Sequence, residues 1–512
     1  MKARRNALST LGMSGAMASL LLIAFGCSSA EAPRNASPMG GVGGHVAAAA
    51  GSSPSSASGG RSQTVAAGGT AGISSASGGF GGVGGGEAAG AGSGGAGTSD
   101  GGQGPSGGAT GSAGGMAGSA GASGSAGASG SAGGPAHSGP PMGWASWNTF
   151  AAKINYTVIK GQADAMVSSG LKAVGYQFVN IDEGWWQGTR DTAGNITVDQ
   201  SDWPGGMKAI ADYIHGLGLK AGIYTDAGKD GCGYYFPTGR PAAPGSGSEG
   251  HYEQDFLAFS QWGFDFVKVD WCGGDKEGLD AQTAYQAIAS AIAKATKQTG
   301  RELTLSVCNW GKQNPWNWAP SISTMWRTSA DIIYYGDSAD MARVFGNFDS
   351  AQHAMAQSPG HYNDPDMLIV GMSGFSTAQN RTHLALWAIA GAPLLAGNNL
   401  ATMNAETKSV LSSPEVIAID QDPLAKQGVK VSDGQGKQVY SKVLSGTARR
   451  AVLLLNRSTS AANIAVRFAD IDLGSSATVR DIWAARDLGR QTTSYSANVA
   501  AQDSVLLLVT GE

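Results

Sequence analysis

Two charged residues with a spacing suited to catalysis, Lys268 and Asp270, follow a short apolar, β-branched run. Side chains alternate across a β-strand, so Lys268 and Asp270 point to the same side. In a (β/α)8 barrel, charged groups at the C-terminal end of a strand occupy the usual catalytic position. Asp270 is therefore the candidate nucleophile. The alternative for this pair alone is an ion pair at the surface of a strand end.

Four further predicted strands end in the same way. Asp182 and Glu183 follow the strand at 176–181, and Asp226 follows the strand at 219–224. Asn309 follows the strand at 303–307, and Arg327 with Asp331 follows the strand at 324–326. The C-terminal ends of parallel strands meet at one face of a barrel, so these side chains are expected to share a site. The recurrence favours a common catalytic face over separate surface ion pairs.

Helical segments alternate with these strands. Apolar residues at helical spacing and Gly stop signals predict helices at 156–169, 207–217, 252–262 and 280–297. Segments 361–367 and 391–395 supply the last two strand positions. Eight strand-plus-helix units in residues 139–426 predict a TIM barrel. A doubly wound sheet is the alternative, but no Gly-rich phosphate loop follows any strand.

After residue 426 the pattern changes to short β-rich runs with turns between them. The runs at 429–431, 439–443, 451–456 and 504–509 predict an antiparallel β-sandwich over residues 427–512. The segment has no cluster of catalytic side chains, so we expect it to be structural.

The first 27 residues have the pattern of an export signal. Lys2, Arg4 and Arg5 precede a short apolar run, and Cys27 lies in segment 24–29, which resembles a bacterial lipobox. We expect cleavage before Cys27 and lipidation of its thiol. This predicts a cell-surface or outer-membrane lipoprotein; an ordinary signal peptide, giving a secreted or periplasmic protein, is the alternative.

Residues 28–138 consist mostly of Gly, Ala and Ser in near-repeats and account for most of the excess in the chain's 80 Gly. No apolar periodicity is present from which a core can be built, so we expect a disordered linker. Any membrane association is predicted to come from the lipid on Cys27 alone.

Charge and cysteine usage narrow the class of protein further. The net charge is −4 and only 14% of residues are charged, which argues against a nucleic-acid partner. Of the four cysteines, lipidation of Cys27 leaves Cys232 and Cys272 as a plausible disulfide, with Cys308 as a buried free thiol. No CxxC motif or cluster of His accompanies them, so no metal site is predicted.

Residues 139–512 resemble glycoside hydrolase family 27, the α-galactosidase or melibiase family. Six stretches carry the resemblance, in the family's order: 142–144 (MGW), 181–185 (IDEGW), 222–224 (GIY), 268–272 (KVDWC), 326–331 (WRTSAD) and 363–367 (NDPDM). The resemblance implies a (β/α)8 barrel followed by an antiparallel β domain, a carbohydrate substrate and no cofactor. It therefore agrees with the fold expected from the residue patterns.

The same resemblance assigns residue roles. It implies that Asp270 is the nucleophile and Asp331 the general acid/base of a retaining glycosidase, which needs one ionised and one protonated carboxyl group. Lys268 beside Asp270 would keep Asp270 ionised, whereas a less compensated Asp331 would hold its proton. The residues that match sugar-binding positions are Trp147, Asp182, Tyr224, Lys268 and Arg327.

Two positions depart from the galactosidase pattern. Glu183 stands where a second Asp is usual, and Asn309 stands where a Glu usually contacts the 2-hydroxyl group. A longer side chain at 183 could intrude where the galactose hydroxymethyl group lies, which would favour β-L-arabinopyranose; alternatively, local backbone shifts absorb both changes. We expect terminal α-D-galactosyl residues as the substrate, with β-L-arabinopyranosides as the alternative. A sugar-binding protein without activity is a third possibility, against which stands the presence of both carboxylates.

Overall fold

The computed structural model describes residues 139–236 and 243–512. The predicted signal peptide (1–27), the lipidation of Cys27 and the predicted linker (28–138) lie outside the described residues.

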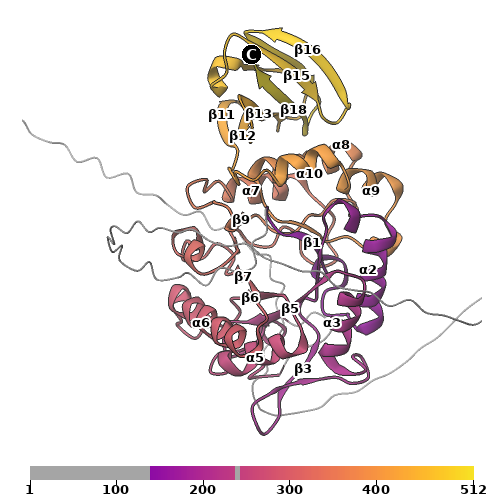
Figure 1. The fold of residues 1–512 in the computed structure, drawn as a ribbon, viewed down its shortest axis with the longest axis vertical. Coiled ribbons are helices and arrows are strands. Elements are labelled where there is room, and N and C mark those ends of the chain that lie inside the picture. Colours follow the sequence, from indigo (N-terminus) through magenta and orange to yellow (C-terminus); the bar gives the residue numbers. More distant parts are fainter. Residues whose placement is uncertain (1–138, 237–242) are drawn as a thin grey trace, which may run out of the picture. The chain divides into compact units, whose positions relative to one another are not determined.

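Eight parallel strands form the centre of the catalytic region (Figure 1). They are β1 (Met142–Ala145), β2 (Phe178–Asn180), β5 (Lys220–Asp226), β6 (Phe266–Asp270), β7 (Thr304–Cys308), β8 (Met325–Arg327), β9 (Tyr362–Asp364) and β10 (Leu394–Ala396). Their order is β10-β1-β2-β5-β6-β7-β8-β9. Just after β9, Leu368 bridges to Ala396 of β10, and this contact closes the ring. The predicted (β/α)8 barrel is confirmed.

Helices connect successive strands around the barrel. The main ones are α2 (Tyr156–Ser168), α3 (Gly206–Gly216), α5 (Tyr252–Trp262), α6 (Ala281–Thr299), α7 (Met341–Ser350) and α8 (Thr377–Ala390). The side chains of Asn155 and Asp280 accept hydrogen bonds from the first turns of α2 and α6. Gly263 and Gly300 end α5 and α6 in the left-handed conformation that glycine adopts at little cost. These caps explain why the predicted helices agree with the observed ones to within two residues.

The two faces of β6 have different roles. Val267 and Val269 are fully buried in the large apolar cluster that the surrounding helices share with the strands. Phe266 belongs instead to the small cluster that fills the barrel interior, with Phe178, Met325 and others. The alternation of a strand then places Lys268 and Asp270 on the interior side, above Phe266. A packed apolar floor therefore lies beneath the charged residues.

A hairpin that the sequence analysis did not predict follows β2. Its strands are β3 (Trp186–Arg190) and β4 (Ile196–Val198), and Asp191 turns the chain by accepting hydrogen bonds from the backbone of Ala193 and Asn195. Arg190 then makes a bidentate pair with Asp255 of α5, at 2.7 and 2.8 Å. The hairpin is therefore fastened to the barrel wall.

The C-terminal strands form the predicted β-sandwich. The strands are β11 (Val429–Gly434), β12 (Lys437–Val443), β13 (Arg449–Asn456), β14 (Ala462–Arg467), β15 (Ser476–Asp481), β16 (Arg486–Thr492), β17 (Ser494–Val499) and β18 (Asp503–Gly511). Six of them pair in the order β11-β12-β13-β18-β15-β16, and β14 pairs with β17. An apolar core lies between the sheets.

The helix α8 joins the sandwich to the barrel. Thr382 of α8 hydrogen bonds to Asp503 and Ser504 of β18, and the buried Lys442 of β12 donates to the carbonyl of Ala388 at 2.9 Å. A buried lysine is costly unless its charge is compensated, and Asp420 supplies a buried carboxylate nearby. The contact is therefore specific rather than a loose apolar one.

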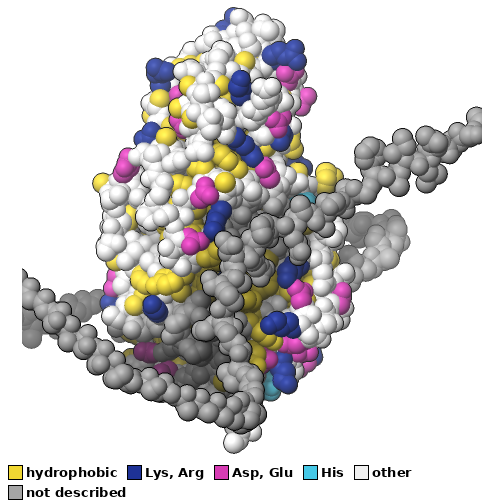
Figure 2. All heavy atoms as spheres, turned by 180° about the vertical axis from the view of Figure 1, so that it is seen from behind, with side chains coloured by type: hydrophobic (Ala, Val, Ile, Leu, Met, Phe, Trp, Pro, Cys, Tyr) yellow, Lys and Arg dark blue, Asp and Glu magenta, His cyan; other side chains and the backbone are white. Residues whose placement is uncertain are grey.

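Charged side chains of both signs are interspersed over the face shown in Figure 2. Within residues 139–236 and 243–512, no helix is long and apolar enough to cross a membrane.

Candidate active site

Strand register brings the site residues of β5, β6 and β7 to one level. Asp226, Asp270 and Cys308 are direct neighbours across the three strands. Two residues earlier, Tyr224 is the neighbour of Lys268 in the same way. Because all five side chains lie on the interior side of their strands, they meet at the C-terminal end of the barrel.

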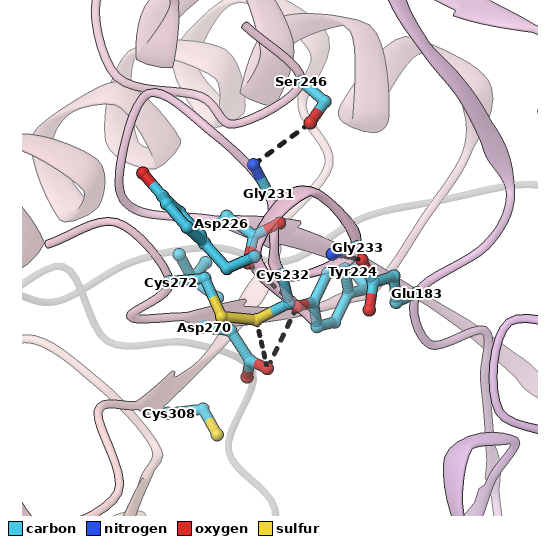
Figure 3. Close-up of a disulfide and its surroundings, with 12 residues drawn as sticks. Glu183, Tyr224, Asp226, Gly231, Cys232, Gly233, Ser246, Asp270, Cys272 and Cys308 are labelled. Carbon is cyan, nitrogen blue, oxygen red and sulfur yellow. Dashed lines mark hydrogen bonds between the residues drawn. A yellow bond between two sulfur atoms is a disulfide. The ribbon is translucent and has the colours of Figure 1, made fainter. Parts of the chain in front are cut away.

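Asp270 lies at the centre of this group (Figure 3). Its Oδ1 is 3.5 Å from the ammonium of Lys268, and its Oδ2 accepts a hydrogen bond from the Tyr224 hydroxyl at 3.0 Å. The Sγ of Cys232 is 3.7 Å from the same Oδ2. Burial raises the pKa of Asp270 to about 6, and the positive charge of Lys268 limits that rise. Asp270 is thus mostly ionised at neutral pH, and the ammonium group of Lys268 lies near its carboxylate at 3.5 Å without a shorter ion pair.

Lys268 connects two carboxylates. Its Nζ is 3.0 Å from Oδ2 of Asp182, which is closer than its contact with Asp270. Burial opposes the charged form of Lys268, but Asp182 and Asp270 outweigh burial and raise its pKa. The backbone N–H of Asp182 donates to the Ser146 hydroxyl at 3.0 Å, which fixes the loop that follows β2. Lys268 therefore remains a protonated, positioned cation.

Two more buried carboxyl groups face the nucleophile. Burial raises the pKa of Glu183 to about 8, and the backbone N–H of Gly233 donates to its Oε1. Burial, together with the charges of Glu183 and Asp270, raises the pKa of Asp226 well above its ordinary value. The Oδ1 of Asp226 is 2.9 Å from the Tyr224 hydroxyl, whose single proton is shared between Asp226 and Asp270. One lysine cannot compensate every carboxyl group buried around it, so Glu183 and Asp226 hold protons while Asp270 carries a negative charge.

The second predicted catalytic carboxylate lies on the loop after β8. Asp331 is partly exposed, and its Oδ1 is 3.0 Å from the guanidinium of Arg327. The same Nη2 of Arg327 is 3.0 Å from the buried Asp366. Burial raises the pKa of Asp366 to about 7, against the opposing charge of Arg327. Asp331 is closer to its cation than Asp270 is to Lys268, but it shares that guanidinium group with Asp366. The expectation that Asp331 holds its proton stays a prediction.

The predicted Cys232–Cys272 disulfide is present beside Asp270 (Figure 3). It joins the short helix α4 (Cys232–Tyr235) to the residue two positions after the nucleophile. Gly228 makes this approach possible, since a Cβ there would lie 2.3 Å from the carbonyl oxygen of Cys272. The bond also holds Gly233 where its N–H meets Glu183. The disulfide thus positions part of the site.

The remaining predicted residues lie at different distances from this centre. Arg327, Asp182 and Lys268 line one small cavity. Trp147 packs on the apolar cluster of the barrel interior. Asn309 is fully buried and donates from its Nδ2 to the carbonyl of Lys312, while its Oδ1 has no hydrogen-bond partner among the described residues. None of the described contacts links Trp147 or Asn309 directly to Asp270.

The sequence analysis gave no role in the site to Asp366 or Cys308, and it grouped Asp226 with the other strand-end charges without a specific role. Asp226 and Asp366 are described above, and Cys308 is a buried free thiol whose Sγ is 3.5 Å from Nη1 of Arg327. Cys308 was expected to be buried, and its strand-end position was the signal for a place in the site. Asp226 carried the same signal, because it ends a predicted strand beside the one with Asp270.

One group of side chains has the composition of a metal site. A carboxylate oxygen of Asp226 and the sulfurs of Cys232 and Cys272 lie within 4.8 Å of one another. A thiolate is the form of cysteine that binds metals, and these two sulfurs are joined to each other in the disulfide. The donor set therefore does not fit a metal ion.

Comparison with known proteins gives matches over both domains. The family model described as alpha galactosidase A matches residues 139–422, and that of the alpha galactosidase C-terminal beta sandwich domain matches residues 434–509. An α-galactosidase of Oryza sativa subsp. japonica is 40% identical over 374 residues, covering 72% of this chain and 84% of the relative.

Solved structures match the same region. The crystal structure of α-galactosidase I from Mortierella vinacea has a TM-score of 0.66 and 30% identity, covering 73% of this chain and 98% of the other. A glycoside hydrolase family 27 β-L-arabinopyranosidase from Geobacillus stearothermophilus has a TM-score of 0.64 at 23% identity, covering 73% and 96% of the two chains. That second likeness concerns the fold alone.

Proposed function

The chain belongs to the alpha galactosidase A family, and from this we propose that it removes terminal α-D-galactosyl residues from oligo- or polysaccharides by double displacement, with Asp270 as nucleophile and Asp331 as acid/base. The chain is an α-galactosidase of the glycoside hydrolase class. The observation that carries the residue assignment is the placement of Asp270: it is buried, beside a lysine, at the C-terminal end of a barrel strand.

In the first step a carboxylate oxygen of Asp270 attacks the anomeric carbon. The bond between that carbon and the glycosidic oxygen breaks, and Asp331 transfers its proton to the departing oxygen. Lys268 contributes by keeping Asp270 ionised. Arg327 lies beside Asp331, and its positive charge stabilises the Asp331 carboxylate once the proton has been transferred.

In the second step a water molecule attacks the anomeric carbon of the glycosyl-enzyme. Asp331, now a carboxylate, accepts a proton from that water, and the bond to Asp270 breaks. The anomeric configuration is inverted twice and so retained. Tyr224 donates a hydrogen bond that stabilises the Asp270 carboxylate as it is released.

The test follows the stereochemistry directly. Hydrolysis of an aryl α-D-galactoside in D2O, monitored by proton NMR, is expected to yield α-galactose first, with the β anomer appearing only as mutarotation proceeds. First formation of the β anomer would contradict the double displacement. Absence of turnover on every aryl glycoside tried would instead favour the sugar-binding alternative.

β-L-Arabinopyranoside hydrolysis remains the second candidate, and Glu183 is the observation that favours it. The Glu183 carboxyl group is buried and accepts a hydrogen bond from the Gly233 N–H, and from its extra methylene relative to Asp we infer less room for a hydroxymethyl group. A matched pair of aryl α-D-galactoside and aryl β-L-arabinopyranoside decides between them. A higher kcat/KM on the arabinopyranoside would overturn the galactoside assignment while leaving the mechanism intact.

We also propose that the enzyme acts outside the cytoplasm, tethered through a lipid on Cys27. The lipobox-like segment and a disulfide in the catalytic domain support this. Cell fractionation with a Cys27→Ala variant tests it: the native protein is expected in the membrane fraction and the variant in the soluble exported fraction. Equal partition of the two would refute the anchor.

A further inference from the structure

Two aromatic rings stand exposed on the loop that carries the acid/base. Tyr334 and Tyr335 retain 59% and 43% of their surface, and they are among the few large hydrophobic side chains this exposed in the described residues. Adjacent exposed rings of this kind commonly mark a binding surface.

The loop holds these rings in fixed positions. Before them, Ile332 and Ile333 are buried in the core, and the Ile332 N–H donates to Asp366 at 2.7 Å. After them, the Ala339 N–H donates to the carbonyl of Ser373 at 2.7 Å. Both ends of the loop are thus hydrogen-bonded to the barrel, so the two rings form a preorganised surface that a ligand need not order on binding.

Basic groups lie over both rings. The Nζ of Lys153 is 5.4 Å from the centre of the Tyr335 ring, and the guanidinium of Arg343 is 5.1 Å from the centre of the Tyr334 ring. Arg343 is also paired with Asp337 of the same loop, at 3.0 Å. Cation–π contacts of this type fix the ring orientation. They also supply hydrogen-bond donors next to an apolar face, a combination that suits a sugar with its hydroxyl edges and C–H faces.

The position of the two rings relative to Asp331 indicates which part of the substrate they would contact. A general acid must touch the glycosidic oxygen, so the leaving group extends outward past it. Tyr334 and Tyr335 come three and four residues after Asp331 along the chain. Lys153, which lies over Tyr335, belongs to the segment that follows β1, so the rings lie at the same C-terminal end of the barrel as Asp331, where a leaving group emerges.

We propose that Tyr334 and Tyr335 form a binding subsite for the leaving saccharide, in which a pyranose ring packs against the exposed sides of the tyrosine rings. This inference rests on the proposed function and assigns Tyr334 and Tyr335 as the residues that favour a leaving sugar ring over a small leaving group. The gain from stacking is made with the leaving group, so it disappears when that group has no ring.

The test compares two substrates that differ only in the leaving group. Melibiose releases a glucose ring, whereas α-D-galactosyl fluoride releases fluoride. In the Tyr334→Ala/Tyr335→Ala double variant, kcat/KM for melibiose is expected to fall by roughly tenfold, mainly through KM, because two stacking contacts of modest strength are lost. The kcat/KM for galactosyl fluoride is expected to stay within about twofold of the native value.

Two controls keep the result specific. Met355→Ala removes another large exposed side chain, 99% exposed, on the loop before β9 at the opposite end of the barrel. It is expected to leave both substrates unaffected. Tyr334→Phe/Tyr335→Phe keeps both rings and is expected to retain melibiose hydrolysis, which also guards against a folding defect in the alanine variant.

Equal losses on melibiose and galactosyl fluoride, or no loss on melibiose, would overturn the subsite. Failure of the native enzyme to hydrolyse galactosyl fluoride at all would instead overturn the proposed function, so the two failures are distinguishable.

Discussion

Replacing Lys268 by methionine tests how the site controls the charge of its nucleophile. The substitution keeps the length and most of the volume of the side chain and removes its charge. It leaves Asp182 and Asp270 as buried carboxylates without the cation that lies 3.0 and 3.5 Å from them. The expected primary effect is a higher pKa of Asp270, because a positive charge that favoured its ionised form is gone.

The size of the effect follows from the distance. At 3.5 Å and an effective dielectric constant of about 20, the attraction between two unit charges is roughly 5 kcal/mol, equivalent to about 3.5 pH units. Water entering the vacated space offsets part of this, so we expect the pKa of Asp270 to rise by about two units from its value of about 6. At pH 7 the ionised fraction then falls by roughly tenfold.

The assay is the pH dependence of kcat/KM on α-D-galactosyl fluoride. Fluoride leaves with little acid assistance, so the acidic limb of the profile reports the nucleophile Asp270 rather than the acid/base Asp331. The native enzyme is expected to lose activity as the pH falls through about 6, since protonated Asp270 cannot attack. The Lys268→Met variant is expected to show the same limb about two units higher, with partial recovery of activity above pH 8.

A matched control uses a lysine–carboxylate pair at the surface. Lys160 is 2.7 Å from Asp164 on α2, with both side chains about 40% exposed. Lys160→Met is expected to leave the profile unchanged, because exposed pairs contribute little. The reasoning is refuted if Lys268→Met lowers activity equally at every pH, since Lys268 would then act through substrate binding and not through the charge of Asp270.

Four further predictions concern the same site. Asp270→Asn is expected to lower kcat by several orders of magnitude while circular dichroism shows an unchanged fold; activity within about tenfold of native would remove Asp270 as nucleophile. Asp331→Ala is expected to reduce melibiose hydrolysis far more than hydrolysis of aryl galactosides with good leaving groups, and equal losses would contradict an acid/base role. Glu183→Asp is expected to raise the ratio of α-galactosidase to β-L-arabinopyranosidase activity by about tenfold or more, measured with the paired aryl glycosides; an unchanged ratio would show that residue 183 does not sense the hydroxymethyl group. The Cys232→Ser/Cys272→Ser variant, which opens a loop with a separation of 40 residues, is expected to lose about 4 kcal/mol of unfolding free energy in urea titrations, and stability equal to the native protein would refute a structural role.

The barrel could be predicted from the sequence because local signals and global fold agree in it. Caps such as Asp280 and stops such as Gly300 lie where the apolar periodicity begins and ends. The β3–β4 hairpin was missed because its two short strands lie within a polar connection, where turn residues after Asp191 look like an ordinary loop. Its contact with Asp255 depends on residues far apart in the chain.

The site was predictable in its residue types and less so in its electrostatics. Strand alternation was enough to place Lys268 beside Asp270. The charge state of Glu183 depends on burial and on the N–H of Gly233, about 50 residues later, which no local pattern indicates. The motif at 326–331 did contain both Arg327 and Asp331, but their ion pair at 3.0 Å depends on side-chain positions that the motif does not specify.

The seam at which the barrel closes also has a consequence for truncated chains. Met142 of β1 pairs with Leu394 of β10, so strands from the two ends of the catalytic sequence join the ring. A chain that ends before residue 394 contains Asp270 and Asp331 but leaves one edge of β1 unpaired, and an unpaired edge is the part of a sheet most prone to pair with another chain. We therefore expect such a truncated chain to aggregate rather than to retain partial activity.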